Sequence, residues 1–230
     1  MNLLRSKPVL VSLAILCLAG VGVFCYNASR VGKVLDSYRS VSVYDNGLLY
    51  FRSYGKHYAQ DGFYYGQKWQ CVEFIKRFFH DAKQHKMPDG MGHAKSFFDQ
   101  TLDDGAVNSR RGLVQYRNGS THGPQPDDLI VFTDTKFGHV AIVTQLATNS
   151  VEIIQQNILA GPRRRFSLVV SNGQYFVTSP RIPAGWLRQY RLQHAVLHAT
   201  TELRQMAVPP GNRLEALKGD RKGQAVRPQP

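Results

Sequence analysis

Cys71 is the only cysteine outside an apolar N-terminal stretch, and it stands where a loop rich in glycine and aromatic residues becomes an amphipathic segment. Apolar residues recur at three- and four-residue intervals from Phe74 to Ala82, until Met87-Pro88 interrupts the pattern, which predicts a helix that starts at Cys71. The N–H groups and positive end of such a helix favour thiolate, the form that attacks carbonyl carbons. The alternative is an inert core cysteine, the commoner fate of a free cysteine in a soluble domain.

His139 is the candidate base for this thiol. It lies in the second of two predicted strands, 126–132 and 138–144, whose β-branched and apolar residues are separated by a short turn. A third predicted strand, 150–158, follows another short turn, so it should pair antiparallel with the second. The histidine would therefore lie on an antiparallel sheet.

The third strand carries amides that can orient the histidine. We expect Leu146 to face Ser150 across the turn. This register places Asn157 opposite His139 and makes Gln155 a diagonal neighbour on the same face. A histidine that serves a cysteine needs an acceptor oxygen at its other ring nitrogen, and either amide can supply one. A slip of one residue would leave both amides on a solvated face.

The residues around the candidate nucleophile and base resemble the CHAP domain, a cysteine- and histidine-dependent amidohydrolase/peptidase module. The resemblance is carried by Tyr65-Gly66-Gln67-Lys68-Trp69-Gln70-Cys71-Val72-Glu73-Phe74, by Gly138-His139-Val140-Ala141-Ile142 and by Gln156-Asn157, and it extends from about 41 to 190. Within this family the chain is particularly similar to the amidase domains of glutathionylspermidine synthetase/amidases.

The resemblance implies an α+β, papain-like fold in which the nucleophile begins a helix packed on an antiparallel sheet. It implies that Cys71 attacks an amide carbonyl and that His139 transfers the proton. Gln70, beside the nucleophile, would help to form the oxyanion hole. The substrate contacts of the similar amidases would fall on Gln70, Lys76, Met91, Gly92, His93, Ala94 and Asn157.

Two positions depart from the similar amidases. Gln155 stands where they place a glutamate, and a neutral amide cannot pair with an imidazolium, so we expect a less favoured thiolate/imidazolium pair and reduced activity. Lys76 stands where their substrate-binding arginine would be, and a lysine cannot make the bidentate contact with a carboxylate. The second departure argues against glutathione specificity.

The N-terminus predicts attachment to a membrane. Arg5 and Lys7 precede Val9–Tyr26, an 18-residue stretch without charge. No small-x-small cleavage site follows it, so we interpret residues 1–28 as an uncleaved, single-pass signal anchor. The basic N-terminal flank favours export of the catalytic domain to the periplasmic or extracellular side.

The rest of the chain predicts one domain, the CHAP amidase domain, over 29–206, long enough for a full core. Its single cysteine allows no internal disulfide. Asn172-Gly173, between two predicted strands, indicates a hairpin that extends the sheet. The basic, Pro- and Gly-containing tail at 207–230 is interpreted as disordered.

Charge bears on partners. The chain has 29 Lys and Arg against 16 Asp and Glu, a formal net charge of +13. This balance, with the cluster Arg163-Arg164-Arg165, favours anionic surfaces such as cell-wall polymers or acidic lipid. A solvated basic surface without a specific partner is the alternative.

No nucleic-acid fold signature is present, and the spacing of cysteine and histidine predicts neither a metal site nor a cofactor. The other histidines are interpreted as surface residues: His57, His80, His85, His93, His122, His194 and His198.

Two classes of function follow from the sequence. The favoured hypothesis is a membrane-tethered thiol amidohydrolase that cleaves an amide or peptide bond through an acyl-enzyme on Cys71. Its substrate is either a glutathionylspermidine-like amide or a peptide amide of peptidoglycan. The alternative is a membrane-tethered CHAP-fold binding module with weak or no catalysis, for which Gln155 is the support.

Overall fold

The computed structural model describes residues 7–189. The predicted tail, two of the predicted surface histidines and the end of the predicted domain lie outside these residues. The described elements are α1 (Lys7–Arg30), β1 (Val34–Tyr38), β2 (Val41–Tyr44), β3 (Lys56–Tyr58), β4 (Tyr64–Gln67), α2 (Cys71–Lys83), the 3-10 helix η2 (Ala94–Phe97), β5 (Val107–Asn108), β6 (Leu113–Arg117), β7 (Leu129–Phe132), β8 (His139–Ala147), β9 (Ser150–Ile154), β10 (Arg163–Ser171), β11 (Gln174–Thr178) and β12 (Pro183–Gln189).

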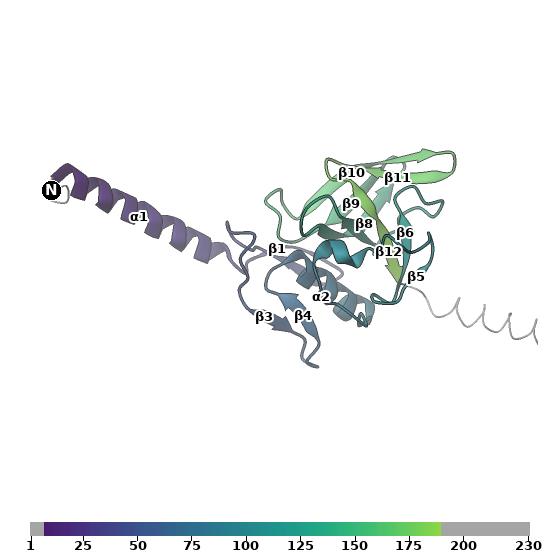
Figure 1. Ribbon diagram of the computed structural model, residues 1–230. Helices are drawn as coiled ribbons and strands as arrows, with labels where there is room; N and C mark the ends of the chain where they lie inside the picture. Colours follow the sequence, from purple (N-terminus) through teal and green to yellow (C-terminus); the bar gives the residue numbers. More distant parts are fainter. Residues whose placement is uncertain (1–6, 190–230) are drawn as a thin grey trace, which may run out of the picture. The chain divides into compact units, whose positions relative to one another are not determined.

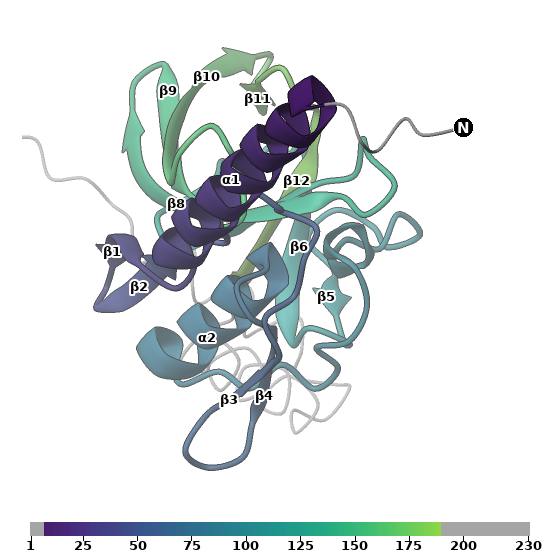
Figure 2. The ribbon, with the colours of Figure 1, turned by 90° about the vertical axis from the view of Figure 1, so that its left-hand side faces the viewer.

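The central sheet has eight antiparallel strands in the order β11-β10-β9-β8-β7-β12-β6-β5. The sheet is curled, and α2 lies against it (Figures 1 and 2). Two further antiparallel pairs, β1 with β2 and β3 with β4, lie outside this sheet. The prediction of an α+β fold with a helix on an antiparallel sheet is therefore confirmed.

The apolar stripe of α2 forms one half of the core. Phe74, Ile75, Phe78 and Phe79 are fully buried, as the three- and four-residue spacing predicted. Burying such a side chain contributes about 1.5 to 3 kcal/mol relative to exposure, so the stripe fixes α2 firmly on the sheet. The sheet residues in the same cluster include Leu113, Leu129, Val131, Val140, Ile142, Ile154 and Leu187.

The opposite face of the central strands is also buried. Ile130 and Ala141, which alternate with the residues facing α2, join a second cluster with Trp186. Leu168 of β10 and Val177 of β11 complete this cluster. Because the strands are covered on both faces, β7 reads as an uninterrupted apolar run rather than an alternating pattern.

The pairing of β8 with β9 differs from the predicted register at the turn. Ala147 pairs with Ser150, so the expected pairing of Leu146 with Ser150 is wrong by one residue. A β-bulge between Val143 and Gln145 absorbs the difference, and beyond it the pairing returns to the expected register. The third strand also ends at Ile154, four residues earlier than predicted.

The N-terminal helix matches the uncharged stretch found in the sequence. Within Pro8–Arg30, the most apolar window of 18 residues has a mean hydropathy of 2.5, and none of that window is buried against the rest of the chain. By length and composition this helix can be either a membrane span or a signal sequence.

We predict that Gly138→Ala will strongly destabilise the protein. Gly138 precedes His139, has φ +72°, and a Cβ there would lie 2.6 Å from both Lys95 N and Phe132 O. Both neighbours are backbone atoms, so the clash cannot be relieved by rotating a side chain. We expect a loss of about 3 kcal/mol or more in the free energy of unfolding, measured with urea.

The matched control is Gly173→Ala. Gly173 has nearly the same backbone conformation, with φ +75°, but nothing lies within 4 Å of an added Cβ. Only the left-handed backbone penalty of about 1 kcal/mol should apply there. Equal losses in the two variants would show that the close approach at Gly138 is unimportant.

Candidate active site

The candidate nucleophile is the first residue of α2. Gln70 is the N-cap in an extended conformation, so Cys71 lies at the positive end of the helix, as predicted. The backbone N–H groups of Val140, Val72 and Cys71 itself act to lower the pKa of its thiol. Val140 follows His139 at the start of β8. The fold thus brings the thiol to the strand end that carries the histidine.

Burial and hydrogen bonding act in opposite directions on this thiol. Burial raises the pKa of Cys71 to about 11, although the three backbone N–H groups and the charge of Arg181 favour the thiolate. The resting form near neutral pH is therefore the thiol. Attack on a carbonyl then requires a base that removes the proton as the bond forms.

His139 is buried and is held by Gln155. Its Nε2 lies 3.1 Å from the side-chain oxygen of Gln155, so Nε2 carries the proton and donates it. The amide nitrogen of Gln155 donates to the Gly161 carbonyl at 3.2 Å, which keeps the amide oxygen turned toward the ring. This arrangement leaves Nδ1 of the neutral ring as the atom that accepts a proton. The predicted diagonal contact between the two residues is present.

The histidine is kept neutral by its surroundings. Burial, together with the charge of Arg181, lowers the pKa of His139 to about 4, and the hydrogen bond to Gln155 only partly opposes this. At neutral pH the site therefore contains a neutral thiol and a neutral imidazole. Gln155 gives the ring its orientation without the charge that a carboxylate would add.

Arg181 was not identified from the sequence. Its guanidinium pairs with Asp134 at 2.9 Å, and its charge acts on both Cys71 and His139. A lone arginine just before β12 has no local pattern that distinguishes it. A surface depression of about 350 Å³ lies next to it, lined in part by Asp134 and Ile182 and not by the candidate catalytic pair.

Asn157 does not occupy the place that the register suggested. The chain leaves the sheet after Ile154 and Asn157 has φ +62°, so its side chain is not bonded to His139. It donates instead to the side-chain oxygen of Gln70 at 2.6 Å and accepts from Asn46 at 2.9 Å. Gln155 alone of the two amides contacts the ring, and any catalytic part played by Asn157 stays a prediction.

The side chain of Gln70 is fully engaged. Its amide nitrogen donates to the carbonyls of Tyr50 at 3.3 Å and Arg52 at 2.8 Å. In this arrangement neither of its N–H groups is directed at a substrate. Its predicted oxyanion role is not tested, and the N–H of Cys71 at the helix end is a further donor suited to it.

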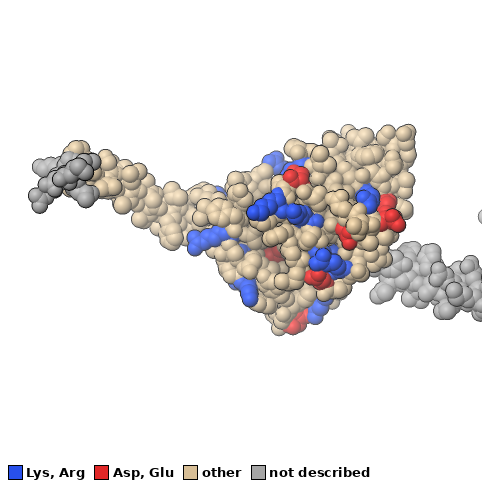
Figure 3. Space-filling view, viewed as in Figure 1, with Lys and Arg blue, Asp and Glu red and all other residues tan. Residues whose placement is uncertain are grey.

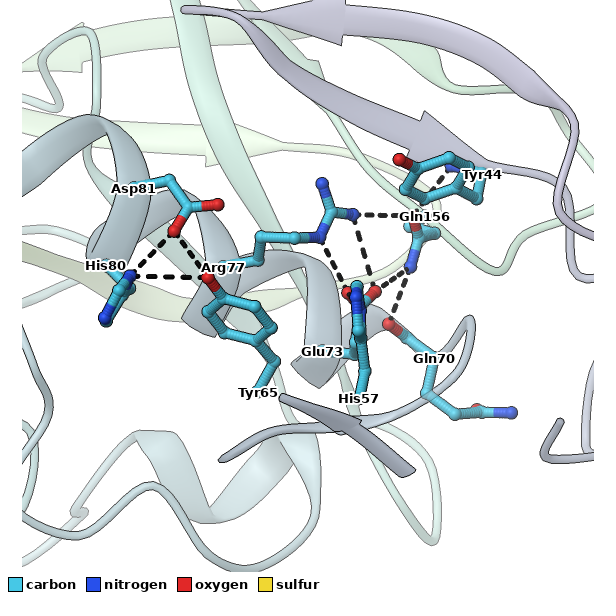
Figure 4. Close-up of polar contacts among 9 residues, drawn as sticks. All are labelled: Tyr44, His57, Tyr65, Gln70, Glu73, Arg77, His80, Asp81 and Gln156. Carbon is cyan, nitrogen blue, oxygen red and sulfur yellow. Dashed lines mark hydrogen bonds and ion pairs between the residues drawn. The ribbon is translucent and has the colours of Figure 1, made fainter. Parts of the chain in front are cut away.

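A buried polar network supports the start of α2 (Figure 4). Glu73, with no exposed surface, accepts from His57 at 2.8 Å, Arg77 at 2.7 Å and Gln156 at 2.7 Å. Burial raises the pKa of this carboxyl, but the three donors outweigh it and the net pKa lies below the ordinary value. Gln156 also donates to the Gln70 carbonyl at 3.0 Å.

The network corrects the interpretation of His57 as a simple surface residue, because it is half-buried and bonded to Glu73. His80 and His85 are also half-buried, and they bond to Asp81 and to the Arg111 carbonyl. Within residues 7–189, no three His, Cys, Asp or Glu side chains gather in a group that could hold a metal ion.

The predicted substrate contacts fall into two groups. Lys76 is 3% exposed, and its ammonium lies under Gly90 and 5.0 Å from the centres of the Phe63 and Tyr64 rings. Burial lowers its pKa. In this state it offers little surface to a ligand, so its substrate role stays a prediction.

Residues 91–94 lie near the turn that precedes His139. The ring of His93 packs 4.7 Å from that of Phe137, and the Lys95 N–H donates to the Phe137 carbonyl at 3.0 Å. Met91 is exposed, whereas Ala94 is buried. The stretch therefore borders the turn that leads into His139.

A comparison with protein-family models identifies the class of domain to which the region around Cys71 and His139 belongs. Residues 61–157 match the family model of the CHAP domain. The chain therefore contains a CHAP domain, and the matched range holds both Cys71 and His139.

The comparison with curated proteins gives particular relatives. The chain is homologous to the amidase domain of the bifunctional glutathionylspermidine synthetase/amidase of Escherichia coli (strain K12), with 37% identity over 139 residues, 54% of this chain and 21% of that protein. Trypanothione synthetase of Crithidia fasciculata is 30% identical over 120 residues, 51% of this chain and 18% of the relative. Glutathionylspermidine synthase of the same organism is 36% identical over 101 residues, 40% of this chain and 14% of the relative. The matched part thus spans about a fifth or less of these relatives.

We predict that acid will destabilise the folded protein through His139. The pKa is about 4 in the folded state against an ordinary value of 6.5, so the unfolded chain takes up this proton first as the pH falls. The stability associated with the neutral ring is fully present above pH 6.5 and is lost as the pH falls to 4. The loss is about 3 kcal/mol, from 1.36 kcal/mol per pKa unit, measured by urea unfolding of the full chain in detergent.

Two variants isolate this contribution. His139→Gln cannot titrate, so it should lack this part of the acid loss, whereas His122→Gln, at an exposed position, should keep it. The same acid loss in His139→Gln as in the wild type would contradict the assignment.

Proposed function

We propose that the chain is a thiol amidohydrolase in which Cys71 is the nucleophile and His139 the general base. The observation that carries this proposal is that the start of α2, the start of β8 and the end of β9 come together at one place. The helix that begins at Cys71 packs against β8, the Val140 N–H acts to lower the pKa of the thiol, and the adjacent His139 has its Nε2 fixed by Gln155. Amidohydrolase activity is also what the CHAP domain and the amidase relatives suggest.

In the proposed reaction, Sγ of Cys71 attacks the amide carbonyl carbon while Nδ1 of His139 takes the thiol proton. The oxyanion that forms is stabilised by the N–H of Cys71 and by Gln70 if its side chain is released. Collapse expels the amine, which receives the proton from Nδ1. Water then attacks the thioester, again with His139 as base, and releases the acid and the thiol.

We further propose that α1 anchors the domain to a membrane, with the domain on the exported side. The support is the length and apolar character of α1 and the basic residues that precede its uncharged stretch. On this proposal the substrate is an amide reached at a membrane, either glutathionylspermidine-like or a peptide of peptidoglycan. The positive net charge favours the anionic cell-wall polymer over a cationic polyamine conjugate.

A membrane-tethered binding module with little catalysis is the second candidate. It is favoured by a specific observation, which is that burial keeps both Cys71 and His139 in their neutral forms. Reactivity of the thiol separates the two candidates.

We predict that Gln155→Glu will make Cys71 more reactive. A carboxylate 3.1 Å from Nε2 would stabilise the imidazolium, raise the pKa of His139 and so favour the thiolate/imidazolium pair. Alkylation of Cys71 by iodoacetamide at neutral pH should rise by about tenfold or more, because an opposite charge this close shifts a pKa by about 1 to 3. Mass spectrometry of the Cys71 peptide measures the rate.

The controls are the wild type and His139→Ala. Labelling of the wild type should be faster than labelling of His139→Ala. If Cys71 is alkylated at the same slow rate in the wild type, in Gln155→Glu and in His139→Ala, the thiol is not activated and the binding-module candidate is supported.

The substrate is tested with the purified full chain in detergent. We expect release of amine from purified muropeptides to exceed release of spermidine from glutathionylspermidine, and Cys71→Ser to abolish both. The reverse preference would support the glutathionylspermidine-like substrate. A reporter fused after Pro230 locates the domain, and a cytoplasmic position would remove peptidoglycan from consideration.

A further inference from the structure

A short loop between β2 and β3 exposes consecutive apolar side chains. In this loop, Gly47-Leu48-Leu49-Tyr50-Phe51-Arg52, hereafter the 47–52 loop, Leu48 is 37%, Leu49 40%, Tyr50 54% and Phe51 74% exposed. Single exposed apolar residues are common on soluble proteins, but four in succession indicate a contact surface.

The 47–52 loop is attached to the C-terminal end of α1. The side-chain oxygen of Asn27 accepts from the Leu48 N–H at 2.7 Å, and its nitrogen donates to the Tyr54 hydroxyl at 3.4 Å. Gly47 permits this approach, because a Cβ there would lie 2.4 Å from the Asn27 oxygen and 2.9 Å from a methyl group of Val31. The loop is therefore held beside the last turn of α1.

This attachment point coincides with the end of the uncharged stretch. Val9–Tyr26 has 18 residues, which span about 27 Å at 1.5 Å per residue, close to the roughly 30 Å of a bilayer's hydrocarbon core. Figure 3 shows no Lys, Arg, Asp or Glu along most of α1, in agreement with the uncharged sequence of Val9–Tyr26, and the charged residues of α1 are confined to its ends, Lys7 and Arg30. Tyr26 is the last residue of this stretch and Arg30 and Lys33 follow it, and tyrosine and basic residues are typical of membrane interfaces.

We propose that the 47–52 loop inserts its apolar side chains into the headgroup region of the phospholipid bilayer that α1 spans. The inference rests on the proposed membrane anchor and holds for either orientation of α1, because the loop always shares the leaflet of Asn27. Tyr50 and Phe51 would serve as aromatic interface anchors.

The loop also reaches the candidate active site. The carbonyls of Tyr50 and Arg52 accept from the side chain of Gln70, next to Cys71, and both also accept from Asn46. A loop seated in the headgroup region therefore places the nucleophile at the bilayer surface. The substrate class would be amides presented at that surface.

The test uses the full chain with Phe51→Trp, reconstituted in vesicles of phosphatidylcholine and phosphatidylglycerol that contain lipids brominated near the glycerol end of the acyl chain. Fluorescence is compared with that of the wild type, which carries Trp69 and Trp186. We expect the added tryptophan to emit at shorter wavelength than in water and to lose at least half of its intensity to bromine. Lipids brominated near the chain end should quench it less.

The matched control is Val170→Trp. Val170 is 52% exposed near the tip of the β10–β11 hairpin, seven residues or about 23 Å along β10 from Arg163, which contacts β1. Its added fluorescence should not be quenched. Flotation of the vesicles with the protein, but no quenching at position 51, would overturn this inference and leave the anchor intact. Failure of the protein to float would overturn the anchor and the inference together.

Discussion

The buried carboxylate of Glu73 is the constraint on which the site depends. An ionised group without exposed surface costs several kcal/mol unless donors surround it, and here they come from three separate parts of the chain. His57 brings β3, Arg77 the next turn of α2, and Gln156 the segment after β9. Because Gln156 also donates to the Gln70 carbonyl, the same side chain that donates to the carboxylate fixes the peptide group before Cys71.

In the candidate pair of Cys71 and His139, the histidine ring is oriented by neutral groups and not by a charged one. Gln155 sets the tautomer and direction of the His139 ring, and Gly161 sets the direction of Gln155, yet none of these contacts contributes a negative charge. The N–H groups around the sulfur favour its ionised form, but burial outweighs them. Proton transfer concerted with attack is consistent with such a neutral pair. The chemistry would then rely on position more than on a preformed ion pair.

Local patterns predicted the parts of this structure that depend on local forces. The start of α2 at Cys71, the Asn172-Gly173 hairpin and the strand around His139 all follow from spacing and turn residues. The diagonal contact of Gln155 was correct because a bulge compensated for a wrong turn register. Arg181 and the partners of Glu73 could not be predicted, since tertiary packing alone brings them together. The insertion of β12 between β7 and β6 is non-local in the same way.

The protonated state of Cys71 has a consequence for chemical durability. Peroxide and other oxidants attack thiolates far faster than thiols, and the products beyond sulfenic acid are irreversible. The domain described here contains no second cysteine that could resolve a sulfenic acid as a disulfide, because Cys17 and Cys25 lie in α1. A sulfur kept in its thiol form is therefore less exposed to oxidation, which no second cysteine of this domain could reverse by forming a disulfide.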